Sequence, residues 1–165
     1  MTFELREGNI LQEVRIPFEV REVKKLHHIG IAVRSLEEGI RFYREVLGFP
    51  LLKREVLKDR GIEIAFFPAG DTQLELIAPL DAQSSFNKSL EKRGEGLHHI
   101  CFEVEDIERS AEELQGKGLL LVEWIRPGSD GGRVCFFHPR TCHGVLIELK
   151  EKEKNFLSPS GRGQR

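Results

Sequence analysis

The chain has 165 residues, of which 39% are hydrophobic and 32% are charged, and its formal net charge is −2 at pH 7. This size and composition predict a soluble protein of one ordinary domain, or of two small fused units that share a sheet. They exclude the clustered excess of basic residues that nucleic-acid binding needs, and no apolar stretch reaches the roughly 18 residues of a membrane span.

The first segment, residues 1–24, is expected to be an extension of the domain. Its opening residues include Glu4 and Glu7 and lack an apolar core, so we do not expect a signal peptide. Further on, "EVRIPFEVREV" alternates apolar and polar residues and predicts an additional strand. Pro17 restricts that strand to the edge of a sheet or to an extended arm.

An internal repeat then begins with "LHHIGIAV" at residues 26–33, which returns as "LHHICFEV" at residues 97–104. A polar helix start follows each string: Ser35 with Glu38 forms a capping box, and Asp106 is suited to an N-cap. Apolar residues at helical spacing continue both helices, and glycines end them. Each half therefore begins with a strand and a helix.

Three strand-like segments follow each predicted helix. They are "PLLKREVL", "GIEIAFFP" and "TQLELIAPL" in the first half, and "LLLVEWI", "GRVCFFH" and "GVLIELK" in the second. This order predicts two βαβββ modules, at about residues 25–80 and 97–151, with a linking helix at about residues 82–93. We therefore expect one α+β domain over residues 25–151 and a flexible C-terminal tail over residues 152–165.

Four polar residues interrupt the apolar strands at matching places in the two modules. Because residues two apart share a face of a strand, His28 lies with the small Gly30 opposite the apolar face, and His99 repeats its position. Glu75 and Glu148 interrupt the last strand of each module in the same way. The histidines are 71 residues apart and the glutamates 73, so a pseudo-twofold pairing of the modules would bring all four together.

Two imidazoles and two carboxylates suit a divalent transition metal. A single histidine in a strand is more often a hydrogen-bonded core residue, and a single glutamate usually faces water. Four such residues in register are better explained together, because burying them without partners would cost on the order of several kcal/mol. The sequence therefore predicts metal ligands at His28, Glu75, His99 and Glu148, with Gly30 leaving space above His28.

Other polar residues near these positions are weaker candidates. His27 and His98 lie one residue away and are expected to point to the other face, as packing residues or as supports of the ligands. Gln73 shares the face of the first glutamate but fits the repeat spacing less well. His138 and His143 lie at strand ends and are weaker metal candidates.

The segments "LHHIGIAV", "ELIAPL", "GEGLHHICFEV" and "RVCFFHPRTCHGVLIEL" resemble the methylmalonyl-CoA epimerases of the vicinal oxygen chelate superfamily. The resemblance covers roughly residues 25 to 151, and its last segment is the most specific. It implies two βαβββ modules that form a cup-shaped mixed sheet around a metal ion. It places the metal ligands on the same four residues, with Co²⁺ expected first and Zn²⁺, Mn²⁺ or Ni²⁺ as alternatives.

The resemblance also implies a reaction on (2R)- and (2S)-methylmalonyl-CoA. The substrate proton lies between a thioester and a carboxylate, and a metal would stabilise the enolate that forms when this proton leaves. Inversion requires a proton to leave one face and return on the other, so two acid/base groups must flank the carbon. Glu148 is one candidate, and Glu63 matches the position of a catalytic glutamate of the family; the alternative for Glu63 is a solvent-facing strand residue.

Other functions share parts of this pattern. Glyoxalase I (lactoylglutathione lyase) uses similar ligands and enolate chemistry on a glutathione hemithioacetal. An extradiol dioxygenase needs two histidines and one glutamate, so the second glutamate counts against it. A metal-free small-molecule binding protein of the same fold needs no ligands in register. Because the epimerases tend to be dimers, the resemblance also implies a homodimer.

Two further features bear on ligand binding and location. The glycine-rich "RPGSDGGRV" lacks the spacing of a P-loop, so we expect a loop at the rim of the cup that either contacts the CoA arm or is a plain hairpin turn. The three cysteines, Cys101, Cys135 and Cys142, are odd in number and lack close paired spacing. They predict buried thiols in a reducing compartment, and we therefore expect a cytoplasmic protein.

Overall fold

The computed structural model describes residues 25–129 and 131–152, so the strand predicted around Pro17 and nearly all of the predicted tail lie outside the described residues. Within these ranges the elements follow the order that the repeat predicts. The strands are β1 (Lys25–Ala32), β2 (Lys53–Leu57), β3 (Ile62–Ala69), β4 (Thr72–Pro79), β5 (Gly96–Val104), β6 (Leu121–Pro127), β7 (Arg133–Phe137) and β8 (Leu146–Glu151). The α-helices are α1 (Leu36–Arg41), α2 (Ser85–Arg93) and α3 (Ile107–Gly116).

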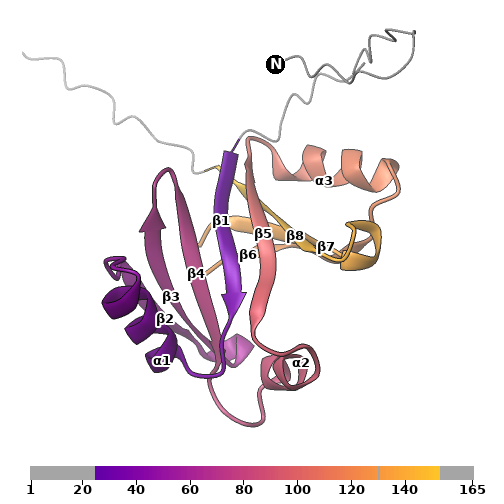
Figure 1. Cartoon of the computed structure of the whole chain (residues 1–165). Helices are drawn as coiled ribbons and strands as arrows, with labels where there is room; N and C mark the ends of the chain where they lie inside the picture. Colours follow the sequence, from indigo (N-terminus) through magenta and orange to yellow (C-terminus); the bar gives the residue numbers. More distant parts are fainter. Residues whose placement is uncertain (1–24, 130, 153–165) are drawn as a thin grey trace, which may run out of the picture.

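The eight strands form one mixed sheet in the order β2-β3-β4-β1-β5-β8-β7-β6. At its centre β1 and β5 pair antiparallel, and each also pairs in parallel with the last strand of its own module, β4 or β8. The sheet curls into a half-barrel, with α1 and α3 on the outside of the two halves (Figure 1). This architecture confirms the predicted α+β fold of two βαβββ modules.

Local chemistry explains where the two outer helices begin. The Ser35 side chain accepts a hydrogen bond from the Glu38 amide at 3.3 Å, and the Asp106 side chain accepts one from the Arg109 amide at 3.1 Å, as expected of N-caps. Each helix packs apolar residues on its own half of the sheet. The two clusters are Leu36, Ile40, Ala65, Phe67, Leu76 and Ala78 at α1, and Val104, Ile107, Ala111, Cys135, Phe137 and Leu149 at α3.

The central pair of strands is irregular at two equivalent places. The register of β1 against β5 passes from Leu26 to His28 without pairing His27, and from His99 to Leu97 without pairing His98. Each irregularity is a β-bulge, in which two residues of one strand oppose a single residue of the other. One bulge therefore falls within each of the two histidine doublets.

The described residues contain no membrane-spanning helix. None of the helices within residues 25–129 and 131–152 is both long enough and apolar enough to cross a bilayer.

Candidate metal centre

The four predicted ligands lie on the inner face of the sheet, on the neighbouring strands β4, β1, β5 and β8. The pairing of these strands arranges the ligands in two rows, each with a small residue between a histidine and a glutamate. The rows are Glu75–Gly30–His99 and His28–Cys101–Glu148. An approximate twofold relation between β1 and β5 exchanges them, so the duplicated sequence yields one shared site.

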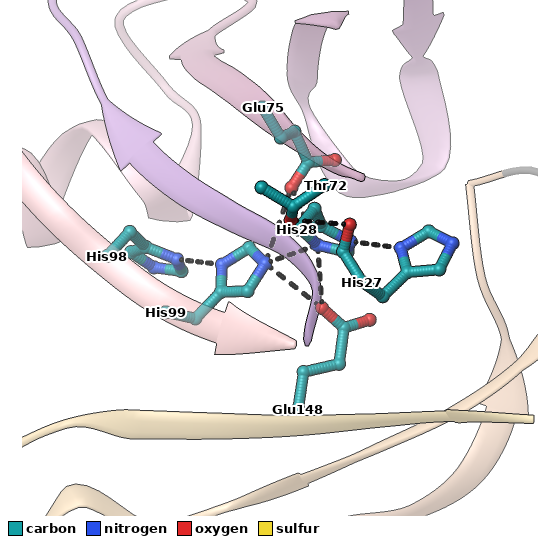
Figure 2. Close-up of polar contacts among 7 residues, drawn as sticks. All are labelled: His27, His28, Thr72, Glu75, His98, His99 and Glu148. Atoms are coloured by element: carbon teal, nitrogen blue, oxygen red, sulfur yellow. Dashed lines mark hydrogen bonds and ion pairs between the residues drawn. The ribbon is translucent and has the colours of Figure 1, made fainter. Parts of the chain in front are cut away.

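Figure 2 shows the four side chains converging from these strands. The Nε2 atoms of His28 and His99 are 2.8 Å apart. The Oε2 atom of Glu148 lies 3.2 and 3.0 Å from these two nitrogens, and the Oε2 atom of Glu75 lies 3.4 and 3.3 Å from them. Donors that share one ion at about 2.0–2.2 Å lie roughly 3.0–3.4 Å apart. His28, His99 and Glu148 therefore form a group that could hold a divalent ion, and Glu75 adds a fourth oxygen beside both nitrogens.

The cluster is buried and strongly coupled. His28, Glu75 and Glu148 are each 6% exposed, and His99 is 3% exposed. Burial raises the pKa of both glutamates, but hydrogen bonds from the two imidazoles outweigh burial and hold each pKa at about 2. Burial lowers the pKa of His99, but the two carboxylates outweigh it and raise this pKa to about 9; they raise the pKa of His28 as well. A divalent ion would therefore take the place of protons held between imidazole and carboxylate.

His27 and His98 do not point to the other face of the sheet, as we expected from regular alternation. The Nδ1 atom of His27 lies 2.8 Å from Nδ1 of His28, and the Nδ1 atom of His98 lies 2.9 Å from Nδ1 of His99. The bulges explain this correction, because a bulge interrupts the alternation of side chains between the two faces. Burial lowers the pKa of both residues to about 4. Each is thus a neutral imidazole in contact with a predicted ligand.

Gly30 leaves space for the other module. A Cβ atom built on Gly30 would lie 2.2 Å from Cε1 of His99, which is far inside van der Waals contact. The sequence predicted that this small residue cleared the space above His28. In the structure it clears the space that the His99 ring occupies, because Gly30 pairs directly with His99 across the β1–β5 boundary.

Two cavities open on the cluster. The larger has a volume of about 720 Å³ and is lined by Glu75, His98, His99 and Glu148, among others. The smaller has a volume of about 450 Å³ and includes His27 and Glu148 in its lining. A small organic substrate can therefore approach the predicted ligands.

Glu63 does not join the cluster. Along β3, Ile64 and Phe66 pack on the inner face, whereas Glu63 alternates with them and shares the outer face with Ala65. Its carboxylate instead accepts a hydrogen bond from Arg54 at 2.9 Å, and Arg54 also contacts Glu37 of α1. The structure therefore contradicts the expectation that Glu63 faces the substrate, since strand alternation turns it away.

The three weaker ligand candidates, two histidines and a glutamine, also lie outside the cluster. His138 caps the turn that follows β7, accepting a hydrogen bond from the Arg140 amide at 3.0 Å. His143 is exposed in the next turn, where its φ is 51°. Gln73 pairs with His28 across β1 and β4 and lines the smaller cavity. None of these three contacts the cluster through a hydrogen bond found among the described residues.

The cysteines are free, as the sequence predicts. Cys101 and Cys135 are buried, and Cys142 is partly buried. Burial raises the pKa of both buried thiols, that of Cys135 to about 12, so neither is an activated nucleophile at neutral pH.

The basic residues that line the two cavities were not predicted from the sequence. Arg60 and Arg126 line the larger cavity, and Arg60 donates a hydrogen bond to the Pro127 carbonyl, so the two halves meet above the cluster. Burial and the neighbouring Arg126 lower the pKa of Arg60. Lys150, which is 5% exposed, lines the smaller cavity. The only sequence signal for the two arginines was their position, because both border predicted turns at the rim of the cup, where a substrate would enter.

Comparisons with known proteins agree with this fold and site. The family model described as "Glyoxalase/Bleomycin resistance protein/Dioxygenase superfamily" matches residues 27–136. The mitochondrial methylmalonyl-CoA epimerase of Homo sapiens is 36% identical over 129 residues, which cover 77% of this chain and 73% of that protein. The ethylmalonyl-CoA/methylmalonyl-CoA epimerase of Cereibacter sphaeroides is 35% identical over 132 residues, covering 78% of this chain and 98% of that protein.

A solved structure extends the likeness to three dimensions. It is a methylmalonyl-CoA epimerase in complex with methylmalonyl-CoA and NH₄⁺, and it superposes with a TM-score of 0.72 at 36% identity, covering 79% of this chain and 95% of that one. The chain belongs to the Glyoxalase/Bleomycin resistance protein/Dioxygenase superfamily and, within it, to the family of the methylmalonyl-CoA epimerases, which are enzymes. The resemblance found in the sequence is thereby confirmed.

Proposed function

We propose that this protein is a metal-dependent epimerase that interconverts (2R)- and (2S)-methylmalonyl-CoA. The observation that carries the proposal is the convergence of His28, Glu75, His99 and Glu148 beside a cavity of about 720 Å³, in a chain related to such epimerases. A divalent ion held by these four residues would stabilise the negative charge that develops on the substrate oxygens as the proton leaves. Co²⁺ is the ion we expect first, with Zn²⁺, Mn²⁺ and Ni²⁺ as alternatives.

We assign the proton transfers to the two buried glutamates. Glu75 comes from the first half of the sheet and Glu148 from the second, and both line the larger cavity. Inversion needs one acid/base group on each side of the reacting carbon, which two carboxylates related by a pseudo-twofold can supply. With Glu63 on the outer face, Glu75 takes the second role that the sequence had given to Glu63.

The cavity also suits an anionic substrate. Arg60 and Arg126 line it from opposite halves, and Arg126 stacks on the ring of Phe136, whose centroid is 5.1 Å from the guanidinium carbon. Guanidinium groups bind carboxylates and phosphates, both of which methylmalonyl-CoA carries. We propose that these arginines hold the substrate at the mouth of the cavity. The protein is further proposed to be homodimeric, as the resemblance implies, and cytoplasmic, as its free cysteines suggest.

The decisive test follows proton exchange. The metal-loaded protein is incubated in D₂O with one enantiomer of methylmalonyl-CoA, with and without a chelator, and deuterium at C2 is measured by mass spectrometry together with the enantiomer ratio. We expect exchange and racemisation that the chelator abolishes. Absence of exchange, together with turnover of the hemithioacetal of methylglyoxal and glutathione, would establish the glyoxalase I alternative, which the same ligand set would also serve.

A further inference from the structure

Each histidine that faces the predicted metal position contacts, through its Nδ1 atom, the histidine that precedes it in the sequence. Nδ1 of His28 lies 2.8 Å from Nδ1 of His27, and Nδ1 of His99 lies 2.9 Å from Nδ1 of His98. In both pairs the rings meet edge to face, at interplanar angles of 78° and 85°. Figure 2 shows both contacts on the side of the ligand rings that faces away from the glutamates.

This contact requires an irregular strand. Neighbouring residues of a regular strand point to opposite faces, so their rings do not share a hydrogen bond. The bulges at His27 and His98 remove each of these residues from the ladder. Bulges are common beside active sites, where they redirect a side chain. The same irregularity occurs in both halves, each time at the residue before a predicted ligand histidine.

The hydrogen-bond chemistry of the pair assigns donor and acceptor. A neutral imidazole carries one N–H and one lone pair, and which nitrogen holds the proton is set by what the other nitrogen contacts. An imidazole that binds a metal through Nε2 carries its proton on Nδ1. The buried Nδ1–H of His28 then needs an acceptor, and the nitrogen placed to accept is Nδ1 of His27; His99 and His98 stand in the same relation.

We propose that His27 and His98 are positioning residues: they accept the Nδ1–H of His28 and His99 and hold both rings in the tautomer that presents Nε2 to a divalent ion. The inference rests on the metal site of the proposed function, but not on the identity of the substrate. Metal-binding histidines usually donate their second N–H to a carboxylate, a carbonyl or water. Here a second imidazole takes that part in each half.

Both positioning residues are themselves fixed. The ring of His98 packs on Phe86 of α2, with centroids 5.2 Å apart. The Thr72 hydroxyl donates a hydrogen bond of 3.0 Å to the carbonyl of His27, which anchors the bulge in β1 to the start of β4. Each residue also lines one of the two cavities, so its own N–H has access to solvent there.

The test compares metal binding in variants at His98 and His27. Each is replaced by Phe, which keeps a ring but cannot accept, and by Asn, whose side-chain oxygen can accept in place of Nδ1. The matched control is His143→Asn, because His143 is exposed and Asn tolerates its φ of 51°. Co²⁺ affinity is measured by competition with a chelating dye, and visible absorption of the bound ion reports its coordination.

We expect His98→Phe and His27→Phe to weaken Co²⁺ binding by about 10–100-fold and to alter the absorption bands. The Asn variants are expected to recover most of this loss, and the control is expected to bind as the original protein does. Nitrogen-detected NMR of the Zn²⁺-loaded original protein should show Nδ1–H on both His28 and His99, which needs no variant to fold. Protonation of Nε2 in that spectrum, or unchanged affinity and spectra in folded Phe variants, would overturn the proposal. Tight Co²⁺ binding without exchange of methylmalonyl-CoA would refute the proposed reaction and leave the positioning role standing.

Discussion

The two halves of the molecule keep the same ligands but place different residues around them. Each half contributes a histidine, a bulge before it and a glutamate on the neighbouring parallel strand. The residue between the ligands is Gly30 in one row and Cys101 in the other. Lys150 lines the cavity beside His27, whereas arginines line the cavity beside His98. The duplication thus preserves what would hold the ion and diverges where a substrate without twofold symmetry would bind.

The largest expected effect separates the two glutamates. If each serves one face of the substrate carbon, Glu148→Gln should abolish deuterium exchange with one enantiomer of methylmalonyl-CoA and keep it with the other, and Glu75→Gln should show the reverse preference. Racemisation should fall by about 10²–10⁴-fold in both variants, because loss of a general base costs this much. Chiral analysis of the deuterated product measures both the exchange with each enantiomer and the rate of racemisation. Equal loss with both enantiomers in both variants would show that the halves do not divide the proton transfers.

The second effect contrasts Gly30 with Cys101. Gly30→Ala places a methyl group 2.2 Å from the His99 ring, so the ring must move. We expect Co²⁺ binding to weaken at least about tenfold, as when support of a ligand is lost, and stability to fall by about 1–3 kcal/mol. Cys101→Ala removes one buried atom and should cost only about 1 kcal/mol with little change in Co²⁺ affinity. Thermal unfolding and dye competition compare them. Equal Co²⁺ affinities of the two variants would show that metal binding does not depend on the space that Gly30 leaves for the His99 ring.

The third effect is the pH dependence of metal affinity. In the metal-free protein the pKa of His99 is raised to about 9 from 6.5, so its protonated form stabilises the fold fully below pH 6.5 and this contribution is lost as pH rises through 9. The glutamates, lowered to about 2 from 4.5, contribute above pH 4.5 and lose that contribution as pH falls through 2. Because an ion must displace the histidine proton, affinity should rise by about tenfold per pH unit and per proton released up to pH 9.

Isothermal titration in buffers of different ionisation enthalpy checks this by counting released protons. A Co²⁺ affinity that does not change between pH 6.5 and 9 would contradict the coupling between the two carboxylates and His99.

The smallest expected effect concerns Glu63. Its carboxylate pairs with Arg54 on the outer face, where the Arg54 side chain is 41% exposed. Glu63→Gln should therefore leave Co²⁺ content and epimerisation within about twofold of the original protein, and stability within about 1 kcal/mol, as for a surface ion pair. Steady-state kinetics and thermal unfolding measure both. A loss of turnover by orders of magnitude with normal metal content would restore Glu63 to the mechanism.

Much of the site follows from local rules that the sequence carries. Alternation along each strand assigns His28, Glu75, His99 and Glu148 to the face opposite the apolar residues beside them, and the repeat makes their positions equivalent. The N-caps at Ser35 and Asp106 are local for the same reason, since the hydrogen bonds involve residues three apart. The two-module fold and the four candidate ligands were therefore within reach of the sequence alone.

Only the tertiary structure decided the remaining features. The orientation of His27 and His98 depends on bulges, and a bulge exists only where two distant strands pair out of step. The space at Gly30 serves His99, which is 69 residues away and reaches it only across the β1–β5 boundary. Glu63 was misplaced because the turn that precedes β3 leaves its register open, and a shift of one residue moves a side chain to the other face. The side-chain faces that alternation along a strand determines could be predicted from the sequence. The bulges and contacts that depend on pairing between distant strands could not.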